Sequence, residues 1–304
     1  MTQKIILAII EIFGLFLIGG IARRLNYIKD SEVDRWSRLT LDIFLPMFTF
    51  STILNGVDRG AIKELWIWPA IGLGQVLFAT TMGFILQYGL HGKDAVRRRT
   101  FLHFCAFNNY TYLPVIIFRN LWGEESLSML FLMGVGSALG VWTIGVAVLN
   151  ASNVKSAVKN VVTPNLVSII AALIIALTVG KSAIPDLLMH VISRAGSIAI
   201  PLILILIGSS LMKKGYLRIT WPVVWISVVR LVILPFFSIM ILKMLPLPRH
   251  IFEAAVIVVL MPIAVATVFM TRRYGGHPDY AASGAVITTL LSMITVPVAV
   301  WLLF

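Results

Sequence analysis

The chain has 304 residues, of which 59% are hydrophobic and only 12% are charged, and its mean hydropathy is +0.95. Soluble domains carry about 25% charged residues, so this composition excludes an ordinary soluble protein and predicts a membrane protein with several spans. The formal net charge of +12 does not indicate nucleic-acid binding, because the basic residues lie in short connections between apolar segments. The single cysteine, Cys105, excludes an intrachain disulfide and a cysteine metal cluster.

Ten apolar segments are long enough to cross the hydrocarbon core of a bilayer. The first begins almost at residue 1 and has no small-residue cleavage site before Arg23 and Arg24, so we expect a span rather than a cleaved leader. The sequence therefore predicts an all-α polytopic membrane protein. The predicted spans are residues 4–22, 36–54, 65–89, 100–119, 126–149, 164–180, 187–211, 218–243, 251–271 and 280–303.

The basic residues are distributed unevenly between the two sides of the predicted bundle. Sixteen lie in or beside the odd-numbered connections, eight lie on the opposite side, and Arg230 lies within a span. Cytoplasmic connections carry the excess of Lys and Arg, so we expect the odd-numbered connections in the cytoplasm and both termini outside it. Most tryptophans, including Trp36 and Trp221, lie near predicted span ends, as in an interfacial aromatic belt.

The stretch from Phe104 to Phe118 is unusual for a membrane span. Its centre carries two adjacent amides, Asn108 and Asn109, followed by Pro114. Proline lacks an N–H and clashes with the preceding turn, so we expect the helix to break or kink just before Pro114. The freed main-chain groups cannot face lipid, and broken helices at mid-membrane are where secondary transporters bind their solutes.

The ten spans divide into two sets of five, residues 1–150 and 151–304. The second span of each set carries a proline, Pro46 and Pro201, and the fourth span of each set carries Pro114 and Pro262. An odd number of spans in each half gives the halves opposite orientations, so the pattern predicts an inverted repeat with interrupted fourth and ninth spans. The alternative is a chance match between prolines that only kink their helices.

Three stretches resemble the auxin efflux carrier family of membrane transport proteins, which includes plant auxin exporters and bacterial organic-acid permeases. Residues 19–53 are similar to the opening hairpin of the family, with its basic turn and the proline of span two. Residues 107–125 are similar to its asparagine-then-proline crossover. The third and most specific stretch, residues 261–298, carries the proline, the Tyr-Gly-Gly turn and the Thr-Thr-Leu-Leu-Ser run.

This resemblance implies ten helices in an inverted five-plus-five repeat, with helices four and nine crossing at their broken centres. It also implies a scaffold part and a transport part that move against each other, termini outside the cytoplasm and a homodimer. The short connection at residues 150–163 is typical of a bacterial-type member. Family members often carry Asn or Ser after the span-nine proline, whereas Thr267 is the first polar residue here, so the span-nine half of the site is less polar.

The side chains near the predicted crossover indicate an anion site. Asn108 and Asn109 provide uncharged donors and acceptors that could bind a carboxylate, assisted by the positive N-terminal end of the following half-helix. The alternative is that both amides only satisfy main-chain groups freed by Pro114. Tyr110, Thr111 and Tyr112 either line the same cavity or pack between helices, and Thr267 is the substrate-binding candidate of span nine.

Three charged residues within predicted spans are candidates for a functional role. Arg230 is about a dozen residues into span eight, where an isolated charge costs roughly 3 kcal/mol, so it either attracts an anionic substrate or ties two helices together through a buried acid. Glu11 and Asp42 are the candidate acids for proton or charge coupling, or else structural partners of Arg230 or of the main chain near Pro46. His103 and Glu253 are expected near the membrane interface.

These features predict a secondary transporter of small organic anions such as carboxylates, working by alternating access. A sodium-coupled organic-anion symporter of related fold is the alternative, and it would need carboxylate and hydroxyl ligands grouped beside the crossover. An intramembrane enzyme or a sensor is the other class, but the sequence shows no convergent acid, base or metal ligands. We expect no cofactor, no metal and no nucleic-acid partner, and Gly275 and Gly276 form a turn rather than a nucleotide site.

Overall fold

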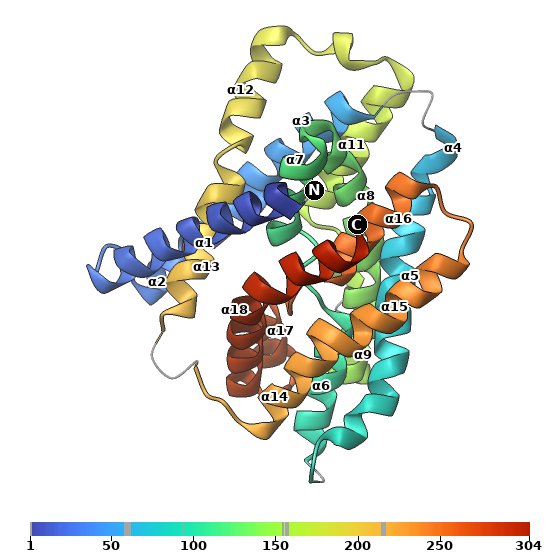
Figure 1. Cartoon of the computed structure of the whole chain (residues 1–304). Coiled ribbons are helices and arrows are strands. Elements are labelled where there is room, and N and C mark those ends of the chain that lie inside the picture. Colours follow the sequence, from blue (N-terminus) through green and yellow to red (C-terminus); the bar gives the residue numbers. More distant parts are fainter. Residues whose placement is uncertain (1, 58–61, 93, 154, 156–157, 214–216) are drawn as a thin grey trace.

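The computed structural model describes residues 2–57, 62–92, 94–153, 155, 158–213 and 217–304. Regular structure within these ranges is helical (Figure 1), apart from one isolated bridge between Asn108 and Ile263. Arg59, Lys93 and Lys214, which contribute to the predicted orientation, lie outside the described residues.

Seven helical stretches of the described chain are long and apolar enough to cross a membrane, and they coincide with seven of the ten predicted spans. They are Gln3–Arg24, Asp30–Gly56, Ile67–Gly89, Glu124–Leu149, Asp186–Leu211, Trp221–Met244 and Pro278–Leu303. Predicted span 164–180 is the 15-residue apolar helix α11 (Pro164–Thr178). Predicted spans 100–119 and 251–271 are each divided into two helices, so ten membrane crossings remain a prediction.

Several of the long stretches contain more than one helical element. The α-helices and π turns described in the first half are α1 (Thr2–Arg24), α2 (Asp30–Leu39), η1 (Thr40–Phe44), α3 (Leu45–Gly56), α4 (Ile62–Leu65), α5 (Ile67–Leu86), α6 (Ala95–Ala106), α7 (Tyr112–Trp122), α8 (Leu127–Gly140), η5 (Val141–Gly145) and α9 (Val146–Leu149). Those of the second half, after α11, are α12 (Asp186–Gly196), α13 (Ala199–Leu211), α14 (Trp221–Val228), η9 (Val229–Ile233), α15 (Leu234–Met244), α16 (Arg249–Val259), α17 (Thr267–Tyr274) and α18 (Pro278–Leu303).

Two of the three π-helical turns, η1 and η9, lie directly before a proline. Pro46 follows η1 and Pro235 follows η9, each within the first two positions of the next α-helix. A proline removes one i to i−4 hydrogen bond, and a wider π turn re-satisfies the neighbouring main-chain groups without ending the helix. Span two therefore stays continuous at Pro46.

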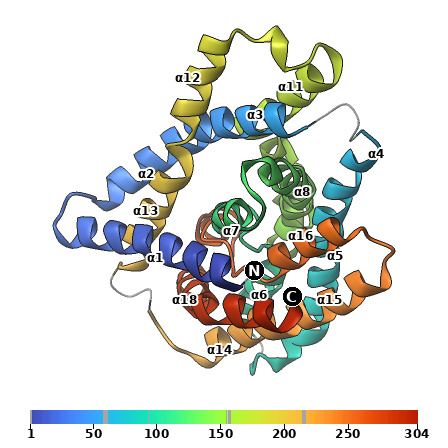
Figure 2. The same ribbon diagram turned by 45° about the horizontal axis from the view of Figure 1, so that its top comes forward.

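The helices form two groups, as both views show (Figures 1 and 2). In the first group, α1 packs on α13, while α11 and α12 pack on α3. In the second group, α5 packs on α6 and α8, α14 and α17 pack on α18, and α15 packs on α16 and α5. The groups meet where α1 contacts α7 and α18 and where α3 contacts α8.

Glycines allow main chains to touch in both groups. A Cβ added at Gly19 of α1 would overlap the carbonyl group of Ile205, and one at Gly208 of α13 would overlap the main chain of Phe16. Small residues of this kind let membrane helices approach closely, and the dense contact stabilises them where lipid provides no hydrophobic driving force between helices.

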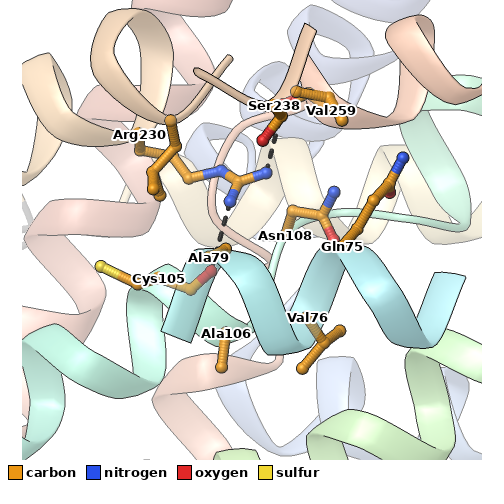
Figure 3. A pocket seen from close by; sticks show the side chains of 10 residues that line it. Gln75, Val76, Ala79, Cys105, Ala106, Asn108, Arg230, Ser238 and Val259 are labelled. Carbon is orange, nitrogen blue, oxygen red and sulfur yellow. Dashed lines mark hydrogen bonds between the residues drawn. The ribbon is translucent and has the colours of Figure 1, made fainter. Parts of the chain in front are cut away.

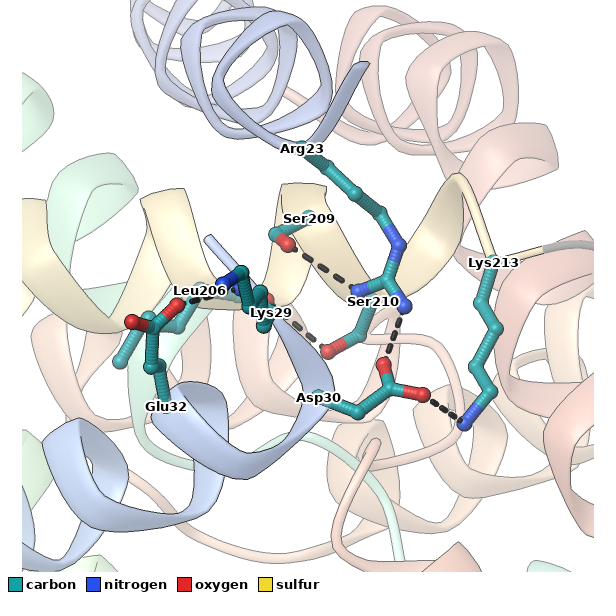
Figure 4. Close-up of polar contacts among 8 residues, drawn as sticks. All are labelled: Arg23, Lys29, Asp30, Glu32, Leu206, Ser209, Ser210 and Lys213. Atoms are coloured by element: carbon teal, nitrogen blue, oxygen red, sulfur yellow. Dashed lines mark hydrogen bonds and ion pairs between the residues drawn. The ribbon is translucent and has the colours of Figure 1, made fainter. Parts of the chain in front are cut away.

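Polar contacts join other helices of the first group. Thr49 of α3 donates its hydroxyl hydrogen bond to Oδ1 of Asn165 in α11, at 2.8 Å. At the ends of α1 and α13, the carboxylate of Asp30 lies between Arg23 and Lys213, whose Nζ is 2.7 Å away (Figure 4). These contacts tie elements from distant parts of the sequence into one group.

Two glycines of α5 offer a matched test of this packing. A Cβ at Gly72 would overlap the carbonyl oxygen of Met133 in α8, whereas a Cβ at Gly74 would meet no atom within 4 Å. We expect Gly72→Ala to lower the melting temperature of the purified protein in detergent. Gly74→Ala is expected to leave it unchanged or raise it, because alanine is favoured over glycine in a helix by about 1 kcal/mol. Equal melting temperatures for the two variants would contradict this account of the α5–α8 contact.

Candidate functional site

The first broken span consists of α6 and α7, separated by residues 107–111. The break thus lies two residues earlier than the predicted position just before Pro114. Pro114 is the third residue of α7, in the first helical turn, where main-chain N–H groups have no partner within the helix and a proline therefore costs no hydrogen bond. The amides Asn108 and Asn109 lie in the non-helical segment itself.

The second broken span consists of α16 and α17, separated by residues 260–266, with Pro262 in the middle of the gap. Thr267 is the first residue of α17 and is fully buried. Both its main-chain N–H and its hydroxyl donate to the carbonyl of Ala264, at 3.0 and 2.8 Å. Thr267 therefore stabilises the turn that starts the second half-helix.

The two non-helical segments pair with each other. The N–H of Asn109 donates to the carbonyl of Pro262 at 2.8 Å, and the N–H of Ala264 donates to the carbonyl of Phe107 at 3.3 Å. A third donor, the N–H of Ile263, reaches the Thr288 hydroxyl of α18 at 3.3 Å. Main-chain groups released by each break are thus satisfied within the protein, as a site away from water requires. We call residues 107–111 and 260–266 the paired breaks.

The two asparagines each use one end of the side-chain amide to support the paired breaks. Nδ2 of Asn108 donates to the carbonyl of Val258 at 2.7 Å, and Oδ1 of Asn109 accepts from the N–H of Tyr112 at 3.1 Å. A carbonyl can only accept and an N–H can only donate, so these partners determine the positions of Oδ1 and Nδ2 in each side-chain amide. Oδ1 of Asn108 and Nδ2 of Asn109 have no hydrogen-bond partner among the described residues.

Arg230 holds the C-terminal ends of both half-helices that lead into the paired breaks. Its guanidinium donates to the carbonyl of Cys105 near the end of α6 (3.4 Å) and to that of Val259, the last residue of α16 (3.3 Å; Figure 3). It also donates to the carbonyl of Met261, in the break that follows α16 (3.0 Å). Arg230 is 4% exposed. Of the two alternatives for Arg230, the tie through a buried acid is not found among the described residues: its partners are carbonyl groups, whose partial negative charge at a helix C-terminus stabilises a cation. Attraction of an anionic substrate stays a prediction.

Arg230 and Asn108 line a small cavity together with two polar residues that the sequence analysis did not single out, Gln75 of α5 and Ser238 of α15 (Figure 3). Gln75 donates through Nε2 to the carbonyl of Ala255 at 3.1 Å, while its buried Oε1 has no partner among the described residues. The cavity volume is about 10 Å³. This is roughly the space of one water molecule, so the site is closed to anything larger in this conformation.

The predicted aromatic candidates lie beside the paired breaks rather than in the cavity. Tyr110 is half-buried, its ring is 5.8 Å from that of Phe107, and it faces Gly134 of α8. Tyr112 is also half-buried and packs against the large apolar core at the start of α7. Thr111, the residue before α7, makes no side-chain capping hydrogen bond. The helix-packing interpretation therefore describes both tyrosines in this conformation.

Glu11 and Asp42 are not buried, which corrects the expectation of buried acids. Oε2 of Glu11 accepts a hydrogen bond from Nδ2 of Asn120, at the far end of α7 from the paired breaks (3.2 Å). Asp42 lies in the π turn η1 and is exposed. Neither acid lines the cavity or pairs with Arg230.

His103 was expected near the interface, but it is fully buried one turn before the end of α6. Nδ1 lies 2.7 Å from the carbonyl oxygen of Gly145 in η5, and Nε2 has no partner among the described residues. The difference arises because α6 begins at Ala95, so His103 is its ninth residue rather than a residue at its start. Glu253 lies near the start of α16 and pairs with the exposed Arg249 at 2.7 Å.

Seven membrane-length helical stretches in the described chain indicate a multi-pass membrane protein, and two paired helix breaks beside a closed polar cavity are typical of the transporter class. The sequence profile of the family described as membrane transport protein matches residues 4–160 and 148–300. The chain therefore belongs to this family of membrane transport proteins, the auxin efflux carrier family, and is a transporter rather than an enzyme.

A relative from Methanocaldococcus jannaschii, described as an uncharacterized transporter, is similar along nearly its whole length. It is 19% identical over 295 residues, which cover 95% of this chain and 96% of the relative. Within the described residues, no group of three or more His, Cys, Asp or Glu side chains is placed to hold a metal ion.

The role of Arg230 at the helix ends can be measured as stability. We expect Arg230→Gln to lower the free energy of unfolding by about 2 kcal/mol, because carbonyls of both half-helices lose a charged donor. Thermal unfolding in detergent measures this loss. Arg24→Gln, at the exposed end of α1, is the control and should unfold like the wild type. Wild-type stability for Arg230→Gln would show that its contacts with the carbonyls of Cys105, Val259 and Met261 are not needed to hold the breaks.

Proposed function

We propose that this transporter moves small organic anions such as carboxylates through the site at the paired breaks. The supporting observation is the chemistry of the cavity: its lining contains the Arg230 guanidinium and the Gln75 and Asn108 amides, but no carboxylate. The unpartnered Nδ2 of Asn109 lies in the same broken segment. The Arg230 guanidinium and the free Nδ2 donor of Asn109 suit a carboxylate ligand, and the N-terminal ends of α7 and α17 favour negative charge. The free ends of Gln75 and Asn108 are the acceptors Oε1 and Oδ1, which suit a hydroxyl or other donor on the same ligand.

We propose alternating access between the two groups of helices. The second group contains both broken spans, so it would carry the substrate site as the transport part, and the first group would be the scaffold. The groups contact each other mainly through α1 with α7 and α18 and through α3 with α8, which are few elements compared with those packed inside each group. Relative movement of such groups would open the closed cavity alternately to the two sides.

We also retain the inverted five-plus-five repeat, residues 1–150 and 151–304, as a proposal. Two observations support it. The fourth predicted span of each half is the divided one. In addition, the first helix of each half packs on the second span of the other half, α1 on α13 and α11 on α3. Ten membrane crossings, helices that cross at the breaks, termini outside the cytoplasm and a homodimer remain predictions of the same proposal.

The alternative of sodium coupling finds little support in the cavity, because no carboxylate lines it. An anion leaving a negative interior needs no coupled ion, since about 2.3 kcal/mol is available per charge at 100 mV. Proton coupling through Glu11 or Asp42 remains a prediction; both carboxylates are exposed and neither lines the cavity.

Transport itself is tested in liposomes that contain the purified protein and are preloaded with labelled mono- or dicarboxylates. We expect protein-dependent efflux that accelerates when an inside-negative potential is imposed, because the potential drives an anion outwards. Varying sodium and pH separately identifies any coupled ion. If no carboxylate moves under any of these conditions, the proposed substrate class is wrong.

Two substitutions of Asn109 distinguish its structural role from a role in substrate binding. Asn109→Ser keeps a side-chain oxygen that can accept from the N–H of Tyr112, but removes the free Nδ2 donor. We expect Asn109→Ser to keep near wild-type stability and to lose most carboxylate flux. Asn109→Ala removes both functions and should lose flux and also about 1 kcal/mol of stability. Wild-type flux in Asn109→Ser would exclude the Asn109 amide as a substrate donor.

A further inference from the structure

A second and much larger cavity lies at the other end of the second group, away from the paired breaks. Its volume is about 240 Å³, compared with the roughly 10–15 Å³ that one water occupies. It is lined by the start of α6 at Arg97, the segment from Arg218 to Val223, and the start of α18. Arg97 is nine residues before the end of α6, and at 1.5 Å per residue this separates the cavity from the paired breaks by roughly 14 Å.

Hydrogen-bond donors from three segments converge on this cavity. Arg97 and Arg218 supply two guanidinium groups, and His277 supplies a ring N–H, because its Nδ1 already accepts from the N–H of Tyr280 at 3.3 Å. Ser283 is only 2% exposed and lines the cavity, and its hydroxyl has no partner among the described residues. A hydroxyl without a partner, on a largely buried residue that lines the cavity with two arginines, indicates a site for a polar anionic ligand.

The carboxylates near these donors limit the choice of ligand. The Asp94 carboxylate caps α6 and lies 3.7 Å from Nε of Arg97. It accepts a hydrogen bond from the main-chain N–H of Arg97, which lowers the pKa of Asp94, so this carboxylate already has partners within the protein. Asp279 lines the cavity without an ion-pair partner in the described chain. An anion that also carries a hydrogen-bond donor would satisfy both the arginines and Asp279.

An aromatic cluster places the cavity at the level of the lipid headgroups. Trp221 lies between the cavity residues Thr220 and Pro222 and is 49% exposed, and it stacks on His91 with ring centroids 5.4 Å apart. Its Nε1 donates to the carbonyl of Gly89 at 3.0 Å. Exposed tryptophans at span ends are characteristic of the membrane–water interface.

We propose that this cavity binds a phosphate-bearing headgroup that carries an amino or hydroxyl donor, as in phosphatidylethanolamine or phosphatidylglycerol. The phosphate contacts Arg97, Arg218 and the Ser283 hydroxyl, and the amino or hydroxyl group donates to Asp279. Basic pockets between membrane helices are known to hold phosphate headgroups. A soluble phosphate ester has the same chemistry, and the experiment distinguishes the two sources.

The test uses the full-length protein, delipidated in detergent, and measures lipid binding by native mass spectrometry and thermal shift. Phosphatidylethanolamine and phosphatidylglycerol are compared with phosphatidylcholine of the same acyl chains, which has no headgroup donor. We expect the first two to bind at least several-fold more tightly. Asp279→Asn should abolish the preference for phosphatidylethanolamine over phosphatidylcholine.

The variants identify the site. Arg218→Gln and Arg97→Gln should each weaken binding about tenfold, because each removes a charge-assisted hydrogen bond. Arg99→Gln is the matched control, since Arg99 is exposed on the same helix as Arg97 and does not line the cavity. Ser283→Ala removes only the unpartnered hydroxyl and provides a second variant that preserves the fold.

Binding of soluble phosphoethanolamine and glycerol phosphate shows whether the ligand is a membrane lipid or a free phosphate ester. If they bind as tightly as the lipids, the ligand is a free phosphate ester, and if only the lipids bind, it is a membrane lipid. Equal binding of phosphatidylcholine by the wild type would overturn the proposal. Wild-type affinity in Arg218→Gln, Arg97→Gln and Ser283→Ala would also overturn it.

Discussion

Main-chain polar groups that cannot face lipid are the constraint on which the rest of this structure depends. Each broken span releases N–H and carbonyl groups, and the two breaks satisfy many of these groups by pairing with each other. Arg230 then holds the helix ends that remain, at Cys105, Val259 and Met261. The site is therefore built mostly from main chain, and side chains such as Asn108 fix its geometry.

The polar side chains at the site use only some of their hydrogen-bonding groups to support the main chain. One end of each asparagine amide supports the main chain, while the other end has no partner among the described residues. Arg230 is engaged with carbonyls but has five N–H donors, of which three make the recorded hydrogen bonds. A ligand could therefore bind without displacing the contacts that hold the breaks together.

The sequence predicts the interrupted spans well, because adjacent asparagines and prolines within apolar segments have few other physical explanations. It does not predict what lies opposite them. Gln75 is the one amide of the mainly apolar helix α5, and only the packing of α5 on α15 and α16 brings it to the cavity. For Arg230 the sequence left open an anionic substrate or a buried acid, because a residue pattern shows side chains only. Its partners in the structure are main-chain carbonyls, which no pattern of residue types reveals. Glu11 and Asp42 were assumed to be buried from their depth along the chain, but burial depends on which face of the helix they occupy.

The position of the only thiol in the chain has a practical consequence. Cys105 is the last residue but one of α6, is fully buried, and lines the cavity beside Arg230. A maleimide therefore has one target in the native protein, and it can react only when the helices separate enough to admit it. The rate of labelling therefore reports how often the cavity opens, and it can be measured without introducing an engineered residue.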